Sequence, residues 1–228
     1  MKAALWILLL ITSSFSQVFY VYTEQLPPFN YMENDKVVGS STALLEEMFK
    51  KSGHSIAHGK ITLTSWARGY HEGLNTPNTI IYSTARTPER ENLFKWVGPI
   101  NKLTIGLIAK KSAKIEIKSP TCLNNYTIAV MHETAGESIL LNAGVKPQNL
   151  ERFSNAASQI KKLHGGRVDM MAFGVEAMYQ LLRNEGIDPS EYEMVYALKE
   201  SDLYFAFHKD TDDAIIKAFN DILKTIKK

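Results

Sequence analysis

Cysteine, long apolar runs and an excess of charge of one sign are all scarce in this chain. Cys122 is its only cysteine, so no intramolecular disulfide can form. The apolar run at residues 3–11 is far shorter than the roughly 20 residues that a membrane-spanning helix needs. The 26 Lys and Arg residues nearly balance the 24 Asp and Glu residues. A near-neutral chain gives no electrostatic case for binding nucleic acid, which favours a concentrated basic face.

The first 16 residues are typical of a signal peptide. Lys2 supplies a positive start, the apolar run follows, and Ser14 and Ser16 lie at the −3 and −1 positions of a cleavage site. A strand-like stretch begins directly afterwards, which argues against a buried N-terminal helix. We expect cleavage near Ser16, a mature chain that starts near Gln17, and a periplasmic location. Cys122 lies too far from this site to be an N-terminal lipid attachment point.

Strand-like and helix-like segments alternate along the chain. Apolar, β-branched and aromatic runs predict strands at residues 18–23, 60–66, 78–83, 104–111, 125–132, 168–173, 192–198 and 203–209, with a hairpin at 32–39. Apolar residues at helical spacing predict helices at 40–51, 67–75, 135–141, 155–163, 175–186 and from about 210 to 226. This alternation predicts an α/β fold with mostly parallel sheets, whose ligand sites lie at the carboxyl ends of strands.

Signatures of common catalytic and metal sites are missing from the sequence. His132-Glu133 lacks the second histidine of an H-E-x-x-H zinc site, and His54 and His58 lie in a turn flanked by glycines. The sequence contains no G-x-S-x-G elbow, P-loop or G-x-G-x-x-G motif. We therefore expect no metal, no cofactor and no enzymatic activity.

The segment most informative about function is IIYSTARTPERENLFKWVGPI, residues 80–100. It predicts a buried strand, a polar turn and Arg90 just inside a following helix. A guanidinium offers two parallel N–H donors that match a carboxylate, and backbone donors nearby can complete an anion site. Taken alone, an arginine after Pro-Glu is more often a solvated residue at a helix start.

Several segments together resemble the type II periplasmic solute-binding proteins of the amino-acid class, which are receptors of ABC transporters. Residues 80–100 are similar to the family pattern S-x-T-x-E-R … F-S-x-P-Y. YTEQLPPFNY and VVGSSTALLEEMFKKSG resemble its opening, SWARGY a P-W-A-R-x-Y run, and GGRVDMMAFG and LYFAFHK two of its later strands. The resemblance implies two Rossmann-like lobes joined by β-strand crossovers. Lobe 1 would comprise residues 17–107 and 203–228, and lobe 2 residues 108–202.

The resemblance also implies a ligand site between the lobes. By position, Arg90 clamps a ligand carboxylate, and Ser83 and Ala85 belong to the turn that supports it. Ala85 departs from the family, which usually carries Ser or Thr there. Trp66 would form an aromatic wall of the pocket, since aromatic faces bind apolar groups and cations. The alternative for Trp66 is a place in the core of lobe 1.

Four further residues of lobe 1 have two interpretations each. Glu24 takes a place near the usual pocket acid, where it would meet a ligand amine, or it is a surface carboxylate. Arg68 is either a second anion contact or an arginine on a helix surface. Phe29 and Tyr31 are divided between the core and the pocket rim.

In lobe 2, the helix start at HETAGES is a candidate anion site. Exposed N–H groups around Ala135 and the hydroxyl of Thr134 favour such a role, although Thr134 can equally be a simple N-cap. The second departure from the family is Gly174, next to Phe173, because members that bind ordinary α-amino acids usually carry an acid there. A ligand ammonium would then depend on Glu24 or Glu176, or the ligand lacks one.

The implied function is capture of a small carboxylate-bearing, amino-acid-like molecule, followed by hinge closure. The implied partner is the membrane permease of an ABC transporter. Two other functions stay open on the same scaffold. One is a sensing module that reports its ligand to a signalling partner. The other is a dehydratase of cyclic carboxylic acids, which Gly174 in place of an acid disfavours.

Overall fold

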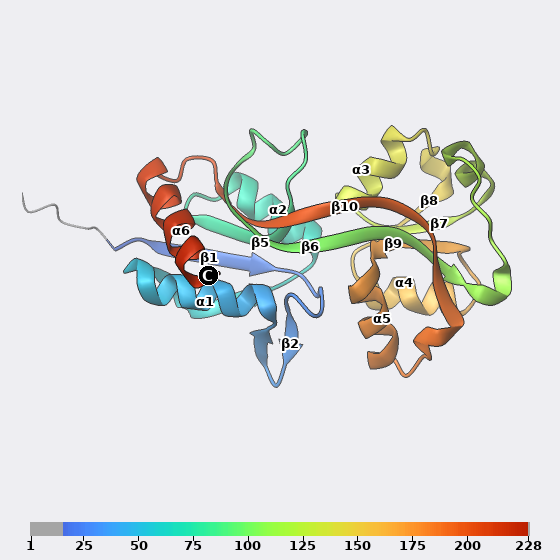
Figure 1. Ribbon diagram of the computed structural model, residues 1–228, viewed down its shortest axis with the longest axis horizontal. Helices are drawn as coiled ribbons and strands as arrows, with labels where there is room; N and C mark the ends of the chain where they lie inside the picture. Colours follow the sequence, from blue (N-terminus) through green and yellow to red (C-terminus); the bar gives the residue numbers. More distant parts are fainter. Residues whose placement is uncertain (1–15, 228) are drawn as a thin grey trace, which may run out of the picture.

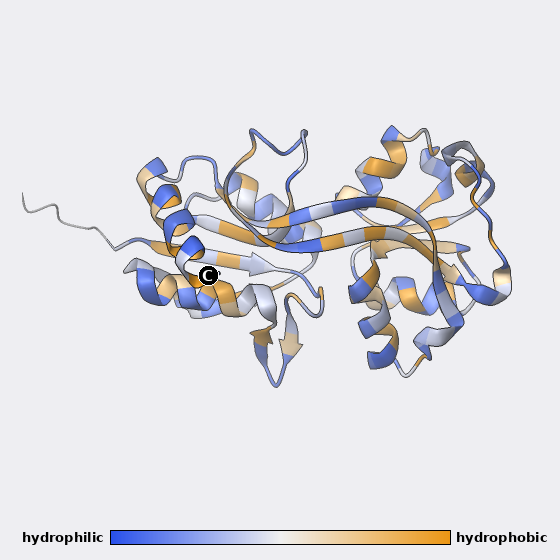
Figure 2. Ribbon diagram, in the orientation of Figure 1, coloured by the Kyte–Doolittle hydropathy of each residue, from blue (hydrophilic) through white to orange (hydrophobic). Residues whose placement is uncertain are grey.

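The computed structural model describes residues 16–227 as two groups of helices and strands joined by two long strands (Figure 1). The predicted signal peptide lies outside the described residues apart from Ser16. Apolar residues concentrate on the strands and on the inner faces of the helices, and polar residues on the loops and outer faces (Figure 2). Within the described residues, every helix is too short or too polar to cross a membrane.

The first group, which we call lobe 1, contains three parallel strands with helices on both faces. Its strands are β1 (Val18–Thr23), β4 (Ser55–Leu63) and β5 (Thr79–Ala85), and a small hairpin is formed by β2 (Tyr31–Glu33) and β3 (Lys36–Val38). Its helices are α1 (Ser40–Ser52), α2 (Trp66–Asn75) and the C-terminal α6 (Asp213–Ile226). Phe219 of α6 packs against Phe19, Phe49 and Phe207, and this aromatic cluster ties the end of the chain to lobe 1.

The second group, lobe 2, has the same kind of organisation. Its strands are β7 (Ile128–Met131), β8 (Leu150–Phe153) and β9 (Met170–Gly174), and its helices are α3 (Ala135–Asn142), α4 (Ala156–His164) and α5 (Val175–Asn184). Short 3-10 turns lie at Lys111–Ala113, Pro120–Asn125, Pro147–Asn149 and Pro189–Glu191. β7 is parallel to both β8 and β9. All five residues of β9 are buried, as expected for a strand covered on both faces.

Two strands of 17 residues each, β6 (Phe94–Lys110) and β10 (Tyr192–His208), run side by side from one lobe to the other (Figure 1). They pair antiparallel along most of their length. The result is one sheet of the order β4-β1-β5-β10-β6-β9-β7-β8. This confirms the α/β class and the two lobes joined by strand crossovers. The predicted lobe boundaries fall inside β6 and β10, which cross without a break, and they stay a prediction.

The structure corrects three of the predicted elements. Arg90 does not begin a helix, because the segment after β5 forms only turns and then enters β6. Three hydrogen bonds close these turns: Arg90 N–H to Thr87 O, Glu91 N–H to Pro88 O and Leu93 N–H to Arg90 O. Trp66 does not end a strand but begins α2. The strands predicted at 192–198 and 203–209 are one strand, because the four polar residues between them still pair with β6. Ser201 is buried there, and the other three, Lys199, Glu200 and Asp202, are exposed on the crossover.

Candidate functional site

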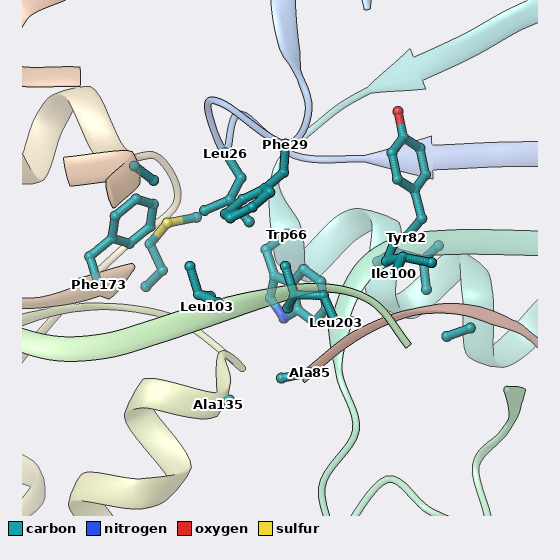
Figure 3. Close-up of a cluster of buried hydrophobic side chains, with 14 of the residues drawn as sticks. Leu26, Phe29, Trp66, Tyr82, Ala85, Ile100, Leu103, Ala135, Phe173 and Leu203 are labelled. Atoms are coloured by element: carbon teal, nitrogen blue, oxygen red, sulfur yellow. The ribbon is translucent and has the colours of Figure 1, made fainter. Parts of the chain in front are cut away.

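A partly open cavity lies between the lobes, and both crossover strands contribute to its wall. Its lining is formed by Glu24, Leu26, Trp66, Ser83, Ala85, Arg90, Leu103, Ile105, Thr134, Ala135, Gly136, Ala172, Phe173, Gly174 and Leu203. Within residues 16–227, Glu24 and Arg90 are the only charged side chains in this set, and both come from lobe 1. Figure 3 shows Leu103 between Phe173 of lobe 2 and Trp66 of lobe 1.

Arg90 is buried in the cavity wall and held across two aromatic rings. Its Cζ atom lies 5.1 Å from the ring centroid of Trp66 and 5.0 Å from that of Tyr70. Its Nη1 donates to the carbonyl of Ala85 at 3.3 Å. Burial lowers the pKa of this guanidinium, and the hydroxyl of Tyr70 and the carboxyl of Glu24 oppose that shift. Arginine stays charged despite such a shift, so a positive charge with a defined orientation faces the cavity.

The loop before α3 brings a backbone acceptor from lobe 2 to the same place. The carbonyl oxygen of Glu133 accepts one hydrogen bond from Arg90 Nη2 at 2.7 Å and one from Trp66 Nε1 at 2.8 Å. A guanidinium carries five N–H donors, and the bonds to Ala85 and Glu133 use two of them. Arg90 therefore connects the two lobes and keeps donors for a ligand.

Glu137 holds the loop that presents this carbonyl. Glu133 has the left-handed φ of 61°, which is uncommon for a residue other than glycine. Its N–H donates to Glu137 Oε2 at 2.7 Å, and Arg152 Nε donates to the other carboxylate oxygen of Glu137. Glu137 is buried in the first turn of α3, where the helix dipole favours a negative charge. The position of the Glu133 carbonyl thus depends on a side chain of lobe 2.

Glu24 is the second ionisable group of the cavity and has few protein contacts. Its side chain is buried, and among the described residues its Oε2 atom has no hydrogen-bond partner. Burial raises the pKa of this carboxyl to about 8, although the positive charge of Arg90 pulls it down. A buried carboxyl without a partner is costly, and a donor on a ligand would reduce that cost.

The remaining predicted residues of the cavity are placed as follows. Thr134 is the N-cap of α3: its hydroxyl accepts from Glu137 N–H at 3.4 Å and donates to the carbonyl of Met131 at 2.8 Å. Ser83 lines the cavity, but its hydroxyl hydrogen bonds with the side chains of Asn30 and Ser41. Ala85, Ala135, Phe173 and Gly174 also line the cavity.

Four predicted residues lie elsewhere. Arg68 is exposed on α2, and Glu176 is exposed at the start of α5. Phe29 belongs to the core of lobe 1, and Tyr31 is half-buried on the hairpin. The choice between Glu24 and Glu176 as a partner for a ligand ammonium therefore falls on Glu24 by position. The binding roles of all these residues stay predictions.

Sequence reasoning missed most of the apolar lining and the supports of Arg90. Leu26, Leu103, Ile105 and Leu203 read as ordinary core residues, because the pattern of a strand does not show which of its buried residues faces a cavity. Glu137 did carry a signal, since Thr134-x-x-Glu137 has the spacing of a capping box. Residues 16–227 contain no group of three or more His, Cys, Asp and Glu side chains placed to hold a metal ion.

The site and the fold define a two-lobed solute-binding protein. Residues 19–228 match the bacterial extracellular solute-binding proteins, family 3. The chain belongs to this family. It is 24% identical over 214 residues to the probable amino-acid-binding protein YxeM of Bacillus subtilis (strain 168), covering 90% of this chain and 77% of YxeM.

Solved structures agree on the fold. The holo form of ArgBP from T. maritima superposes with a TM-score of 0.79 at 18% identity, over 92% of this chain and 91% of that one. The arginine-, lysine-, histidine-binding protein ArtJ of Geobacillus stearothermophilus gives a TM-score of 0.74 at 19% identity, over 92% and 89%. A histidine kinase sensor domain with similarity to periplasmic binding proteins gives 0.79 at 15% identity, over 92% and 90%. At these identities the likeness concerns the fold, and the family assignment makes the chain a ligand-binding receptor.

Proposed function

We propose that this chain is a periplasmic receptor that captures a small carboxylate-bearing molecule, amino-acid-like in size, and delivers it to the permease of an ABC transporter. The observation that carries the proposal is Arg90: a buried guanidinium on the wall of the inter-lobe cavity, with donors left for a ligand. A buried cation of this kind matches a carboxylate better than it matches any neutral group. The likeness to YxeM, a probable amino-acid-binding protein, and to the holo form of ArgBP supports the amino-acid class.

The composition of the cavity narrows the ligand further. Apart from Arg90 and Glu24, its wall is formed by apolar side chains, small residues and the hydroxyls of Ser83 and Thr134. An apolar body would be desolvated against Trp66 and Phe173, which is favourable at about 25 cal/mol per Å². We therefore expect a carboxylate with an apolar or aromatic body to bind more tightly than a highly polar amino acid.

The experiment that tests this function removes the guanidinium. Native mass spectrometry of the purified protein identifies a retained small molecule, and a thermal-shift panel of the twenty amino acids and of aliphatic and aromatic carboxylates finds further ligands. Arg90→Ala should then weaken binding in calorimetry by about 2–5 kcal/mol, because the ligand carboxylate loses its charged partner. Arg90→Lys should recover part of that loss, since an ammonium keeps the charge but not the paired donors.

Arg68→Ala is the matched control, because Arg68 is an exposed arginine of the same lobe, on α2. It should leave the affinity at the wild-type value. Wild-type affinity in Arg90→Ala would refute the carboxylate clamp.

Location and partner belong to the same proposal. The family is one of extracellular proteins, and the first 16 residues have the pattern of a signal peptide. N-terminal sequencing of the protein from its native host should start near Gln17, and a start at Met1 would contradict export.

A sensing role is the second candidate, and the kinase sensor domain with the same fold favours it. Adjacent permease and ATPase genes would support transport, whereas an adjacent sensor kinase gene would support signalling. A dehydratase activity is not proposed, because the position that would carry the cleft acid is Gly174.

A further inference from the structure

Gly174 lies at the end of β9, in the cavity wall, where the space in front of its Cα is already filled. A Cβ atom built on Gly174 would lie 2.6 Å from Cδ1 of Leu103, 3.4 Å from its Cγ and 3.5 Å from its Cδ2. Non-bonded carbon atoms normally stay at 3.5–4.0 Å. All three of the nearest atoms belong to one side chain, so Leu103 alone accounts for the lack of space.

Leu103 comes from the crossover strand β6 and reaches this position because of the sheet register. Ile105 pairs with Gly174, and Leu103 precedes Ile105 by two residues, so it points to the same face of the sheet. Leu103 is buried and lines the cavity together with Ile105 and Leu203 (Figure 3). The leucine therefore occupies the place into which any side chain at position 174 would project.

We propose that Leu103 is a specificity-determining residue: by filling the space over Gly174 it makes the lobe-2 end of the cavity apolar, so that the site selects a carboxylate without an adjacent ammonium. This inference rests on the proposed function, since it concerns the ligand of the same cavity. An ammonium against this wall would face Leu103, Ile105 and Phe173 and lose its hydration without gaining a partner there. Glu24, the acid of the cavity lining, lies on lobe 1, and burial raises the pKa of its carboxyl, which favours the neutral form over the carboxylate that an ammonium needs. An apolar body gains contact with the same atoms.

The first arm of the test needs no ligand and examines the packing. Gly174→Ala adds only the Cβ atom, and it should lower the Tm by about 2–4 °C, a small overpacking cost because the crowded Cδ1 is the end of a flexible side chain. In the Leu103→Ala background the same substitution should leave Tm nearly unchanged, because the crowded atoms are gone. Leu203→Ala is the matched control: it removes a buried, cavity-lining leucine that is not among the three nearest contacts of a Cβ at position 174, so Gly174→Ala should stay costly there. An equal cost in the Leu103→Ala and wild-type backgrounds would overturn the proposal.

The second arm compares two probes that differ only in the α-ammonium, 3-phenylpropanoate and phenylalanine. Wild type should bind 3-phenylpropanoate more tightly, by about tenfold or more, since a 1.4 kcal/mol difference is tenfold. The Leu103→Ala/Gly174→Asp double variant gains room and an acid, so its preference should reverse toward phenylalanine. Leu203→Ala/Gly174→Asp should not reverse it.

Each result of the second arm decides one point. A wild type that prefers phenylalanine, or a double variant with the wild-type ratio, overturns the role of Leu103 and leaves the Arg90 clamp standing. If Arg90→Ala binds 3-phenylpropanoate as tightly as wild type does, the proposed function itself is overturned. A wild type that binds neither probe contradicts the expected class of ligand and with it this specificity, while the packing arm still reports on the contact.

Discussion

Lobe 1 brings Arg90, Glu24 and the Trp66 ring to the cavity, whereas lobe 2 brings a backbone carbonyl, a helix start and an apolar wall. The ionisable side chains of the site are therefore on one lobe, and the groups that close over them on the other are neutral. The Glu133 carbonyl accepts a hydrogen bond from the buried guanidinium without neutralising its charge, so the site still favours an anionic partner for Arg90. Under the proposed function, lobe 1 would therefore recognise a ligand by charge and lobe 2 by shape.

The largest expected effect concerns Glu24 of lobe 1 and the free energy that ionising its buried carboxyl costs the folded protein. Glu24 has a pKa of about 8 in the folded protein and about 4.3 in an unfolded chain. Between those pH values the folded state holds a proton that the unfolded state has lost, so the free energy of unfolding falls as pH rises through this window. Glu24→Gln cannot ionise. At pH 9 it should be more stable than wild type by about 2–4 kcal/mol, and at pH 4 it should be about equal.

Urea unfolding of wild type and Glu24→Gln at pH 4, 6 and 9 measures this difference. Glu33→Gln, an exposed glutamate on the hairpin of the same lobe, is the control and should follow wild type at every pH. If the Glu24→Gln difference were the same at pH 4 and pH 9, folding would not raise the pKa of Glu24, and the buried carboxyl would carry no cost specific to lobe 1.

The next effect concerns Glu137 of lobe 2, which acts on the site indirectly by holding the Glu133 loop. Glu137→Ala removes the acceptor of the Glu133 N–H and the partner of Arg152. We expect a loss of about 1–3 kcal/mol in stability, as for other buried groups left unpaired, together with weaker binding of 3-phenylpropanoate. Chemical denaturation and calorimetry measure the two.

Glu176→Ala is the control for this prediction, since Glu176 is also a first-turn acid of a lobe-2 helix but is exposed. It should change neither quantity. Unaltered affinity in Glu137→Ala would mean that the Glu133 loop keeps its position without that carboxylate.

The smallest effect concerns the contact between the lobes. Trp66→Phe keeps an aromatic ring under Arg90 but loses the N–H that donates to Glu133 O at 2.8 Å. A hydrogen bond of this kind contributes about 0.5–1.5 kcal/mol, so affinity should fall by about two- to tenfold. Small-angle X-ray scattering of the ligand-free variant should also show a larger radius of gyration, because the lobes separate more readily.

Trp96→Phe provides the comparison within one lobe. Trp96 Nε1 donates to the carbonyl of Glu91 at 3.0 Å, and both residues belong to lobe 1. This variant loses the same kind of bond without touching the contact between the lobes, so the scattering curve should match wild type. A similar change in both variants would show that the Trp66 bond has no special part in closure.

The order of strands and helices could be predicted because it depends on local patterns. Apolar residues at helical spacing placed α1, α4 and α5 within a few residues of their observed ends, and the β-branched run of β1 was found with both bounds. The prediction was wrong where local signals were short. Thr87–Pro88 is typical of a helix start, but the few residues before β6 form only turns. The polar centre of β10 suggested two strands where there is one continuous strand.

The sequence by itself determined the family and the two-lobed α/β class, because these depend on motifs of neighbouring residues. It named Arg90, Trp66 and Glu24 as candidates, with two interpretations each for Trp66 and Glu24. Only the tertiary structure decided what those residues meet. The Glu133 carbonyl reaches Arg90 across 43 positions of chain, and Leu103 reaches Gly174 through the register of two antiparallel strands. Neither contact can be predicted from local composition. Every residue has a backbone carbonyl, and the pattern of a strand does not distinguish one buried leucine from another. The charged residues of the site can be identified from the sequence, whereas the shape of the cavity depends on how the sheet pairs its strands across the two lobes.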